Sequence, residues 1–82
     1  MERIQQIADS MTHPHEVIYN REGETSVRWF VGELTVEIYD YDLDMVSDGY
    51  YGEAEDDLGR LERLAFYEEA EIRRYLDAAA AE

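Results

Sequence analysis

Apolar residues early in the chain recur at three- and four-residue spacing, which predicts a short helix over residues 1–12. The residues that share its apolar face are Ile4, Ile7, Ala8 and Met11. Pro14 disfavours helical geometry at the residue before it, so the helix should end near His13. The sequence therefore predicts an amphipathic helix that buries one side.

The pattern then changes to a period of two, which is typical of strands. Residues 16–20 are β-branched and aromatic in their middle, and a Gly-containing turn is expected at residues 21–24. The run 25–31 alternates, and so does the run 34–39 after a tight turn at Gly32. The residues that share one face of the first of these runs are Thr25, Val27, Trp29 and Val31. Three successive strands with short turns predict an antiparallel β-meander.

From Glu53 onward the apolar spacing favours a helix up to about Ala79. The residues of this broad stripe are Ala54, Leu58, Leu61, Leu64, Ala65, Ile72, Tyr75, Leu76 and Ala79. Acidic residues in the first turns agree with the helix dipole. Gly59 costs about 1 kcal/mol relative to alanine inside such a helix and marks a potential break.

These elements predict one α+β domain over residues 1–82. It consists of a short N-terminal helix, a three-stranded antiparallel β-meander and a long C-terminal helix packed on one sheet face. The covered face is expected to hold Val27, Trp29, Val36 and Ile38. The opposite face is expected to hold Ile18, Arg28, Phe30, Tyr39 and Tyr41, with Phe30 as an ordinary cover residue. If the N-terminal helix does not cover that opposite face, the face forms an exposed acidic patch with aromatic residues that is suited to binding a partner.

Charge changes this picture most. The 82 residues include 21 Asp and Glu against 7 Lys and Arg, a net charge of -14, and every basic residue is an arginine. Solubility needs a net charge of only about 2–8 in a small domain. A larger charge destabilises the compact state through self-repulsion. We therefore expect the protein to be repelled by nucleic acids and anionic membranes and attracted to a basic protein surface.

The acidic residues are concentrated between Arg28 and Arg60, where no basic residue occurs. Those of this stretch are Glu33, Glu37, Asp40, Asp42, Asp44, Asp48, Glu53, Glu55, Asp56 and Asp57. In an extended chain, alternate carboxylates lie about 6.6 Å apart, on the order of the spacing between phosphates of a nucleic-acid strand. The segment can thus imitate such a strand, although a merely solvated acidic surface is the competing interpretation.

Tyrosines are interleaved with these acids, and aromatic side chains are typical anchors of protein interfaces. Tyr50 and Tyr51 lie between two glycines, so we expect them in an exposed loop. The predicted partner-binding residues are Glu33, Glu37, Tyr39, Asp40, Tyr41, Asp42, Asp44, Asp48, Tyr50, Tyr51, Glu53, Glu55, Asp56 and Asp57.

Calcium binding is an alternative for part of this segment. The alternating Asp40, Asp42 and Asp44 resemble the opening of an EF-hand loop. The position that should be glycine is Met45, and the position of the bidentate glutamate is Tyr51. The preceding residues also favour a strand rather than a helix, so we expect no metal site here.

Other chemistry has little support. The chain has no cysteine, and its serines lack a nucleophile motif. There is no glycine-rich phosphate loop. His13 and His15 provide two metal ligands without a third, so a linker role is expected for both. We expect no catalytic activity and no cofactor.

In its acidity, its length and the run from Glu33 to Asp57, the sequence resembles small phage-encoded inhibitors that mimic nucleic acid, anti-CRISPR proteins among them. The resemblance implies a stoichiometric inhibitor that blocks target DNA at the basic groove of a CRISPR effector complex. Two alternatives remain open: an antitoxin or immunity protein for a cationic toxin or nuclease, and a phage assembly protein that self-associates through residues 58–79. We expect a monomer or homodimer. We also expect it in the host cytoplasm, because no transmembrane run or signal peptide is apparent.

Overall fold

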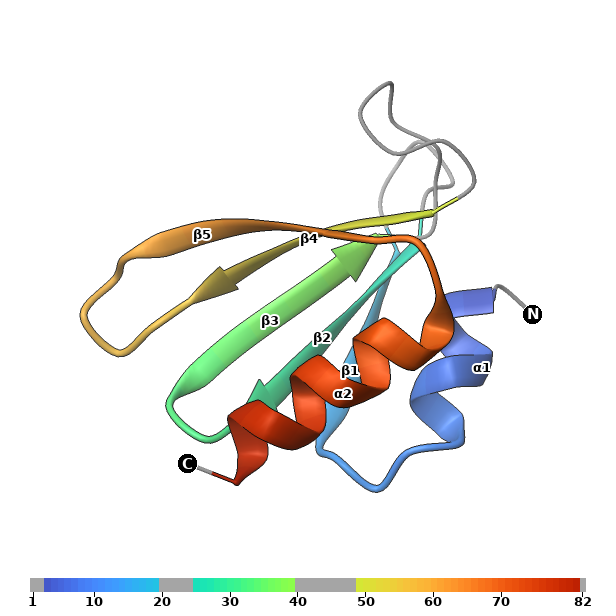
Figure 1. The fold of residues 1–82 in the computed structure, drawn as a ribbon, viewed down its shortest axis with the longest axis horizontal. Helices are drawn as coiled ribbons and strands as arrows, with labels where there is room; N and C mark the ends of the chain where they lie inside the picture. Colours follow the sequence, from blue (N-terminus) through green and yellow to red (C-terminus); the bar gives the residue numbers. More distant parts are fainter. Residues whose placement is uncertain (1–2, 20–24, 40–48, 82) are drawn as a thin grey trace.

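The computed structural model describes residues 3–19, 25–39 and 49–81, and Figure 1 shows their arrangement. In chain order the elements are α1 (Arg3–Asp9), β1 (His15–Tyr19), β2 (Thr25–Val31), β3 (Leu34–Tyr39), β4 (Tyr50–Glu55), β5 (Leu61–Phe66) and α2 (Glu69–Ala80). The strands form one sheet in the order β1-β2-β3-β4-β5, and each neighbouring pair is antiparallel. The predicted α+β class is confirmed, whereas the sheet has five strands and not three.

The helix and the three strands predicted for the first half of the chain are confirmed. The predicted helix and strands correspond to α1, β1, β2 and β3. Gly32 has a φ of 57°, so it supplies the left-handed backbone that the tight turn between β2 and β3 requires. The turn expected at residues 21–24 lies outside the described residues.

The helix predicted to run from Glu53 to Ala79 is wrong for its first half, because residues 50–55 and 61–66 are strands. Leu58 and Leu61, which belonged to the predicted helical stripe, are 72% and 66% exposed. Only α2 remains of the predicted helix. Helix α2 begins with a capping box. The side chain of Glu68 accepts a hydrogen bond from the backbone N–H of Glu71, and the side chain of Glu71 accepts one from the backbone N–H of Glu68.

Cross-strand pairing explains why this segment forms strands. Gly52 of β4 lies between Ile38 of β3 and Leu64 of β5, so its position is fixed by both neighbours. A Cβ at Gly52 would lie 2.9 Å from the carbonyl oxygen of Glu37, so β4 approaches β3 too closely for a side chain there. Gly59, with a φ of 79°, lies in the turn that joins β4 to β5. Contacts between distant segments therefore override the local helical spacing.

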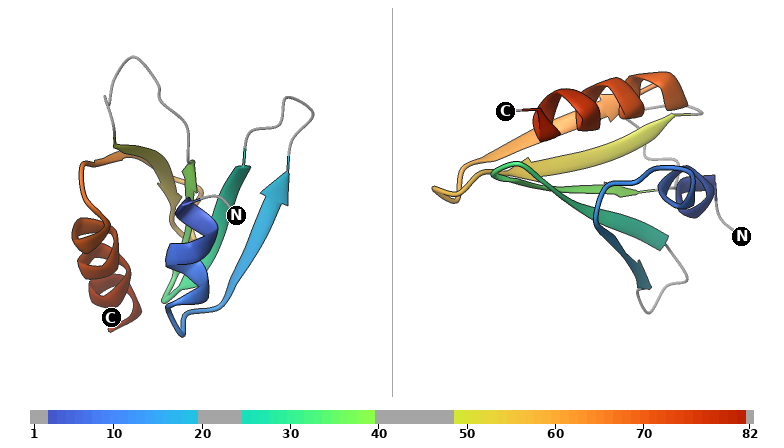
Figure 2. Two further views of the ribbon diagram at one scale, coloured as in Figure 1. Left: turned by 90° about the vertical axis from the view of Figure 1, so that its right-hand side faces the viewer. Right: turned by 90° about the horizontal axis from the view of Figure 1, so that it is seen from below.

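One hydrophobic core occupies a single face of the sheet, which we call the core face. Its fully buried centre includes Val27, Trp29, Val36 and Ile38, as the alternation predicts. Helix α1 adds Ile4, Ile7 and Ala8, and α2 adds Ile72, Leu76 and Ala79. Helix α1 contacts β2, and α2 contacts both β2 and β5. Figure 2 shows the two helices and the twist of the sheet from two further sides.

Candidate protein-binding surface

Side chains on the sheet face opposite the core, which we call the open face, form three rows across the strands. The aromatic row consists of Ile18, Ser26, Tyr39, Tyr51 and Ala65. The charged row consists of Glu16, Arg28, Glu37, Glu53 and Arg63. The third row consists of Phe30, Thr35, Glu55 and Leu61. The core residues of both helices belong to the other face, so neither helix covers these rows.

Arg28 organises one half of the charged row. Its Nη2 donates to Oε1 of Glu37 at 2.8 Å, and its Nη1 donates to Oε1 of Glu16 at 3.2 Å. The hydrogen bond that Arg28 donates to Glu37 raises the pKa of Arg28 above its usual value, although partial desolvation opposes the shift. The guanidinium therefore stays charged and holds carboxylates of two neighbouring strands.

The other half of the charged row is less engaged. Glu53 and Arg63 are directly paired across β4 and β5, yet within the described part of the chain no ion pair forms between them. The hydroxyl of Tyr51 donates to Oε1 of Glu53 over a long 3.4 Å. Arg63 is exposed. This half of the row therefore offers one carboxylate and one guanidinium to a partner.

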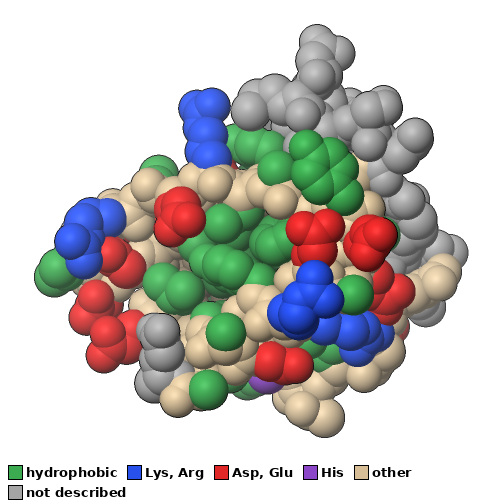
Figure 3. Space-filling model, viewed as in Figure 1, with side chains coloured by type: hydrophobic (Ala, Val, Ile, Leu, Met, Phe, Trp, Pro, Cys, Tyr) green, Lys and Arg blue, Asp and Glu red, His purple; other side chains and the backbone are tan. Residues whose placement is uncertain are grey.

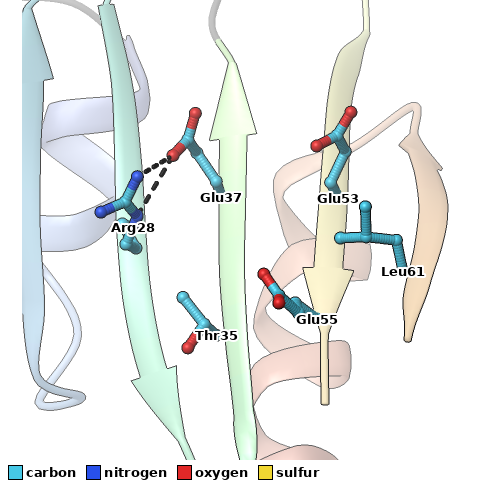
Figure 4. Close-up of a pocket in the computed structure, with 6 residues that line it drawn as sticks. All are labelled: Arg28, Thr35, Glu37, Glu53, Glu55 and Leu61. Carbon is cyan, nitrogen blue, oxygen red and sulfur yellow. Dashed lines mark hydrogen bonds and ion pairs between the residues drawn. The ribbon is translucent and has the colours of Figure 1, made fainter. Parts of the chain in front are cut away.

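A hollow of about 340 Å³ lies between these rows. It is lined by Arg28, Thr35, Glu37, Glu53, Glu55 and Leu61. Figure 4 shows Arg28 turned toward Glu37, while Glu53, Glu55 and Leu61 stand on the other side. The hollow thus combines carboxylates with one aliphatic wall.

A second acidic region lies at the end of the sheet where the turns β2–β3 and β4–β5 meet. We call it the acidic end and define it by four exposed carboxylates: Glu33, Glu55, Asp57 and Glu62. Glu33 and Asp57 line one hollow together, and Glu62 lines an adjoining hollow that shares Asp56 and Arg60 with the first. Figure 3 shows acidic side chains gathered at this end, at its left. No ion pair among the described residues involves these four carboxylates.

Asp56 holds the turn at the acidic end. Its Oδ1 accepts hydrogen bonds from the backbone N–H groups of Leu58 and Arg60, each at 2.9 Å. Its Oδ2 accepts from Nε of Arg60 at 2.7 Å. The backbone hydrogen bond from Arg60 is the main cause that lowers the pKa of Asp56 below its usual value. Asp56 thus pairs with Arg60, which lines both hollows, and within the described part of the chain the four carboxylates of the acidic end form no ion pair.

The predicted exposure of Tyr50 and Tyr51 is wrong, because they are only 6% and 9% exposed. Strand β4 begins at Tyr50, so the two neighbours point to opposite faces. Tyr50 joins the core, and Tyr51 stacks on Tyr39 with ring centroids 5.8 Å apart. Phe30, expected to be a cover residue, is instead 46% exposed on the open face.

The remaining predicted site residues fall into three groups. Glu37, Tyr39, Tyr51, Glu53 and Glu55 lie on the open face. Glu33, Asp57 and the same Glu55 belong to the acidic end, and Asp56 holds the turn there. Asp40, Tyr41, Asp42, Asp44 and Asp48 lie outside the described residues, and so does the calcium alternative built on them. The sequence analysis missed Glu16, Leu61, Glu62 and Arg63. The signal for the last three was the turn sequence from Asp56 to Gly59, which places a strand directly after it.

The two histidines make structural contacts. His13 contacts Oδ1 of Asp77 in α2 through its Nε2 at 2.7 Å, and Nδ1 of His15 lies 3.0 Å from the carbonyl oxygen of His13. Among residues 3–19, 25–39 and 49–81, no three potential ligands converge as a metal site would require. Neither described helix has the length and apolar character needed to span a bilayer.

Comparison with known proteins identifies no relative: no family model, no curated protein and no solved structure matches this chain.

Proposed function

We propose that this protein is a non-catalytic binding protein that occupies the nucleic-acid-binding surface of a basic partner protein. The observation that carries this proposal is the acidic end, where Glu33, Asp57 and Glu62 line two adjoining hollows. These three carboxylates and Glu55 are exposed, and none of the four forms an ion pair among the described residues. A net charge of -14 extends the attraction beyond the contact surface. The resemblance to phage inhibitors favours a CRISPR effector complex as the partner and DNA mimicry as the mode of inhibition.

The physical basis is competition for the same cations. Lys and Arg side chains that hold phosphates pair equally well with a row of carboxylates. Long-range attraction accelerates such association, and salt weakens it because the charges are screened. The acidic end is rigidly presented, because Glu33 and Asp57 belong to two tight turns and Asp56 fixes one of them. A preformed acidic surface loses little conformational entropy on binding.

The proposal is tested by calorimetric titration of the protein into a purified type I CRISPR surveillance complex across a salt series. We expect binding at about 50 mM salt that weakens by at least about tenfold at 300 mM, as charge pairing requires. The triple variant Glu33→Gln, Asp57→Asn, Glu62→Gln should bind about tenfold more weakly at the lower salt concentration. Glu55 stays unchanged in this variant because it also belongs to the open face.

A matched control removes the same number of charges elsewhere. The control is the triple variant Asp9→Asn, Glu16→Gln, Glu69→Gln. The three carboxylates that it removes are exposed and lie next to His15, Arg28 and Arg73, respectively. The control variant should bind within about threefold of the wild-type protein, since it changes the net charge but not the acidic end. Absence of binding at low salt, or equal losses in the two variants, would rule out the proposal.

The segment predicted from sequence to imitate a phosphate row needs its own variant. Asp40→Asn, Asp42→Asn and Asp44→Asn together should weaken binding if these carboxylates also contact the partner. An unchanged affinity would restrict the binding surface to the acidic end and would leave the proposed function standing.

A further inference from the structure

The signs of the charges along the charged row form a self-complementary pattern. From β1 to β5 the row contains Glu16, Arg28, Glu37, Glu53 and Arg63. A second copy that is rotated by 180° about an axis along β3 presents the same row in reverse order. Glu16 then faces Arg63 of the second copy, and Arg28 faces Glu53 of the second copy. Each of these contacts occurs twice, and only Glu37 on the axis faces its own equivalent.

We propose that the open face binds a second copy of this chain, so that two sheets pack face to face with the two-fold axis parallel to β3. Isologous contact of this kind is the commonest route to a symmetric dimer. The pattern favours this axis over the perpendicular one. Rotation about an axis across the strands would place Arg28 against Arg28 and Glu16 against Glu16.

The proposed arrangement also gives ion-pair partners to two groups, Glu53 and Arg63, that form no ion pair with the other described residues. Arg63 has no ion pair among the described residues, and in the dimer it faces Glu16. Glu53 accepts only the long hydrogen bond from Tyr51, and in the dimer it faces Arg28. Opposite charges across an interface fix its orientation and exclude wrong partners.

The third row adds an apolar contact to the same geometry. Phe30 lies on β2, so in the dimer it faces Glu55 on β4 of the second copy. Thr35 and Leu61 flank that Glu55 on the neighbouring strands β3 and β5. These three residues line the hollow of about 340 Å³. The half-exposed Phe30 ring of each copy therefore lies over the hollow of the other, against the aliphatic wall of Leu61.

The twist of the sheets does not remove these pairs. If the axis is inclined by about 15° to β3, the two sheets cross at about 30°, as aligned sheets do, and β1 and β5 lie about 9.6 Å from β3 at a strand spacing of about 4.8 Å. The facing residues at the edges are thus displaced along the strands by about 5 Å, less than the spacing of about 6.6 Å between rows. The long side chains of Glu16 and Arg63 span that displacement.

The net charge sets the conditions under which the dimer forms. Two chains of net charge -14 repel one another over the whole molecule, and this axis brings both acidic ends to the same side. The Debye length, over which salt screens this repulsion, is about 30 Å at 0.01 M salt but only about 8 Å at 0.15 M. The contact pairs are short and survive the screening. Dimerisation should therefore strengthen between these salt concentrations, opposite to the salt dependence of partner binding.

Analytical ultracentrifugation of two reversed-charge variants tests the proposal. Arg63→Glu alone places Glu against Glu16 twice, and Glu16→Arg alone places Arg against Arg63 twice. Each variant alone should dimerise at least about tenfold more weakly than the wild-type protein at 0.15 M salt. An equimolar mixture should recover dimers within about threefold of the wild type, because both contacts are complementary again.

Repulsion between the net charges alone predicts that one variant, Glu16→Arg, dimerises more strongly and not more weakly. Glu16→Arg lowers the net negative charge, so without the proposed contact it would dimerise more tightly than the wild type. Arg74→Glu, an exposed change on α2 with the same charge difference as Arg63→Glu, serves as the matched control and should lower dimerisation far less. Phe30→Ser should weaken the dimer without any change of charge. Circular dichroism verifies that each variant is folded.

A wild-type protein that stays monomeric at every salt concentration would overturn the inference. So would a mixture that dimerises no better than its two components. The inference does not depend on the proposed function, because dimerisation is measured without the basic partner and the acidic end is unchanged in these variants.

Discussion

The two faces of the sheet differ in what they contribute. The core face buries Val27, Trp29, Val36 and Ile38 beneath two helices, and these side chains are completely inaccessible. The open face keeps a charged row in its centre and leaves Phe30 and Leu61 exposed beside it. The two described helices contribute their buried residues to the core face. The comparison indicates that the buried apolar core lies on one face, while the other face keeps exposed charges and aromatic and aliphatic side chains.

The largest expected difference between the faces is at two consecutive residues of β2. Trp29→Ala should lower the free energy of unfolding by about 3–5 kcal/mol, because it leaves a cavity in the core. Phe30→Ala removes a similar ring from the open face and should cost less than about 1 kcal/mol. Urea denaturation followed by circular dichroism measures both. Equal losses would contradict the division between the faces.

The indole nitrogen adds a second comparison at the same site. Trp29 Nε1 is buried and has no hydrogen-bond partner within the described residues. Replacement by phenylalanine removes an unsatisfied donor, so Trp29→Phe should cost distinctly less than Trp29→Ala. The two variants thus separate the packing of the ring from its polar atom.

The next largest effect is expected at the junction of β3 and β4. Gly52→Ala should lower the free energy of unfolding by about 1–3 kcal/mol, because the new Cβ would meet backbone and Ile38 at close range. Gly59→Ala provides the comparison in an open position, where the nearest other atom is 3.9 Å away and only the positive φ is unfavourable. Gly59→Asn should be milder than Gly59→Ala, since asparagine tolerates that backbone. Thermal unfolding monitors the series, and a harmless Gly52→Ala would show that β4 and β3 are not in close contact.

The smallest effect concerns the turn at the acidic end and depends on pH. The pKa of Asp56 is lowered in the folded protein, so its stabilising contribution is complete above the unfolded value of about 3.9. That contribution is lost as the pH falls through the lowered folded value, because a protonated Asp56 binds Arg60 and the turn amides less well.

Asp56→Asn separates this effect from the general relief of repulsion in acid. The stability difference between wild type and Asp56→Asn should be clear at pH 7 and shrink below about pH 3.9. Urea denaturation at several pH values measures it. A difference that grows as the pH falls would contradict the assigned role of Asp56.

The first three strands and α1 were predictable because their patterns are local. Residues 25–31 and 34–39 alternate on both sides of a tight glycine turn, and no other element fits that pattern. The strands β4 and β5 were not predictable in this way, since Leu58, Leu61 and Leu64 also fit a helical stripe. Exposure of Leu58 and Leu61 becomes apparent only when β5 pairs with β4 through the turn between them.

The candidate site was partly predictable for the same reason. The concentration of acid between Glu33 and Asp57 is a property of the sequence, and the described part of it lies on the open face and at the acidic end. The turn sequence from Asp56 to Gly59 indicates that a strand follows, but the faces on which Glu62 and Arg63 lie depend on the register of β5 against β4, which the turn alone does not specify. Tyr50 illustrates the converse, because its flanking glycine suggests a loop while its strand position buries it.

Zero-length crosslinking tests the central claim most directly. A water-soluble carbodiimide joins carboxylates to lysines that touch them, and mass spectrometry of the complex with a purified type I CRISPR surveillance complex identifies the residues. The account predicts crosslinks from Glu33, Asp57 and Glu62 that disappear at high salt. Crosslinks confined to Asp9, Glu69 and Asp77, with the acidic end unreacted, would contradict it.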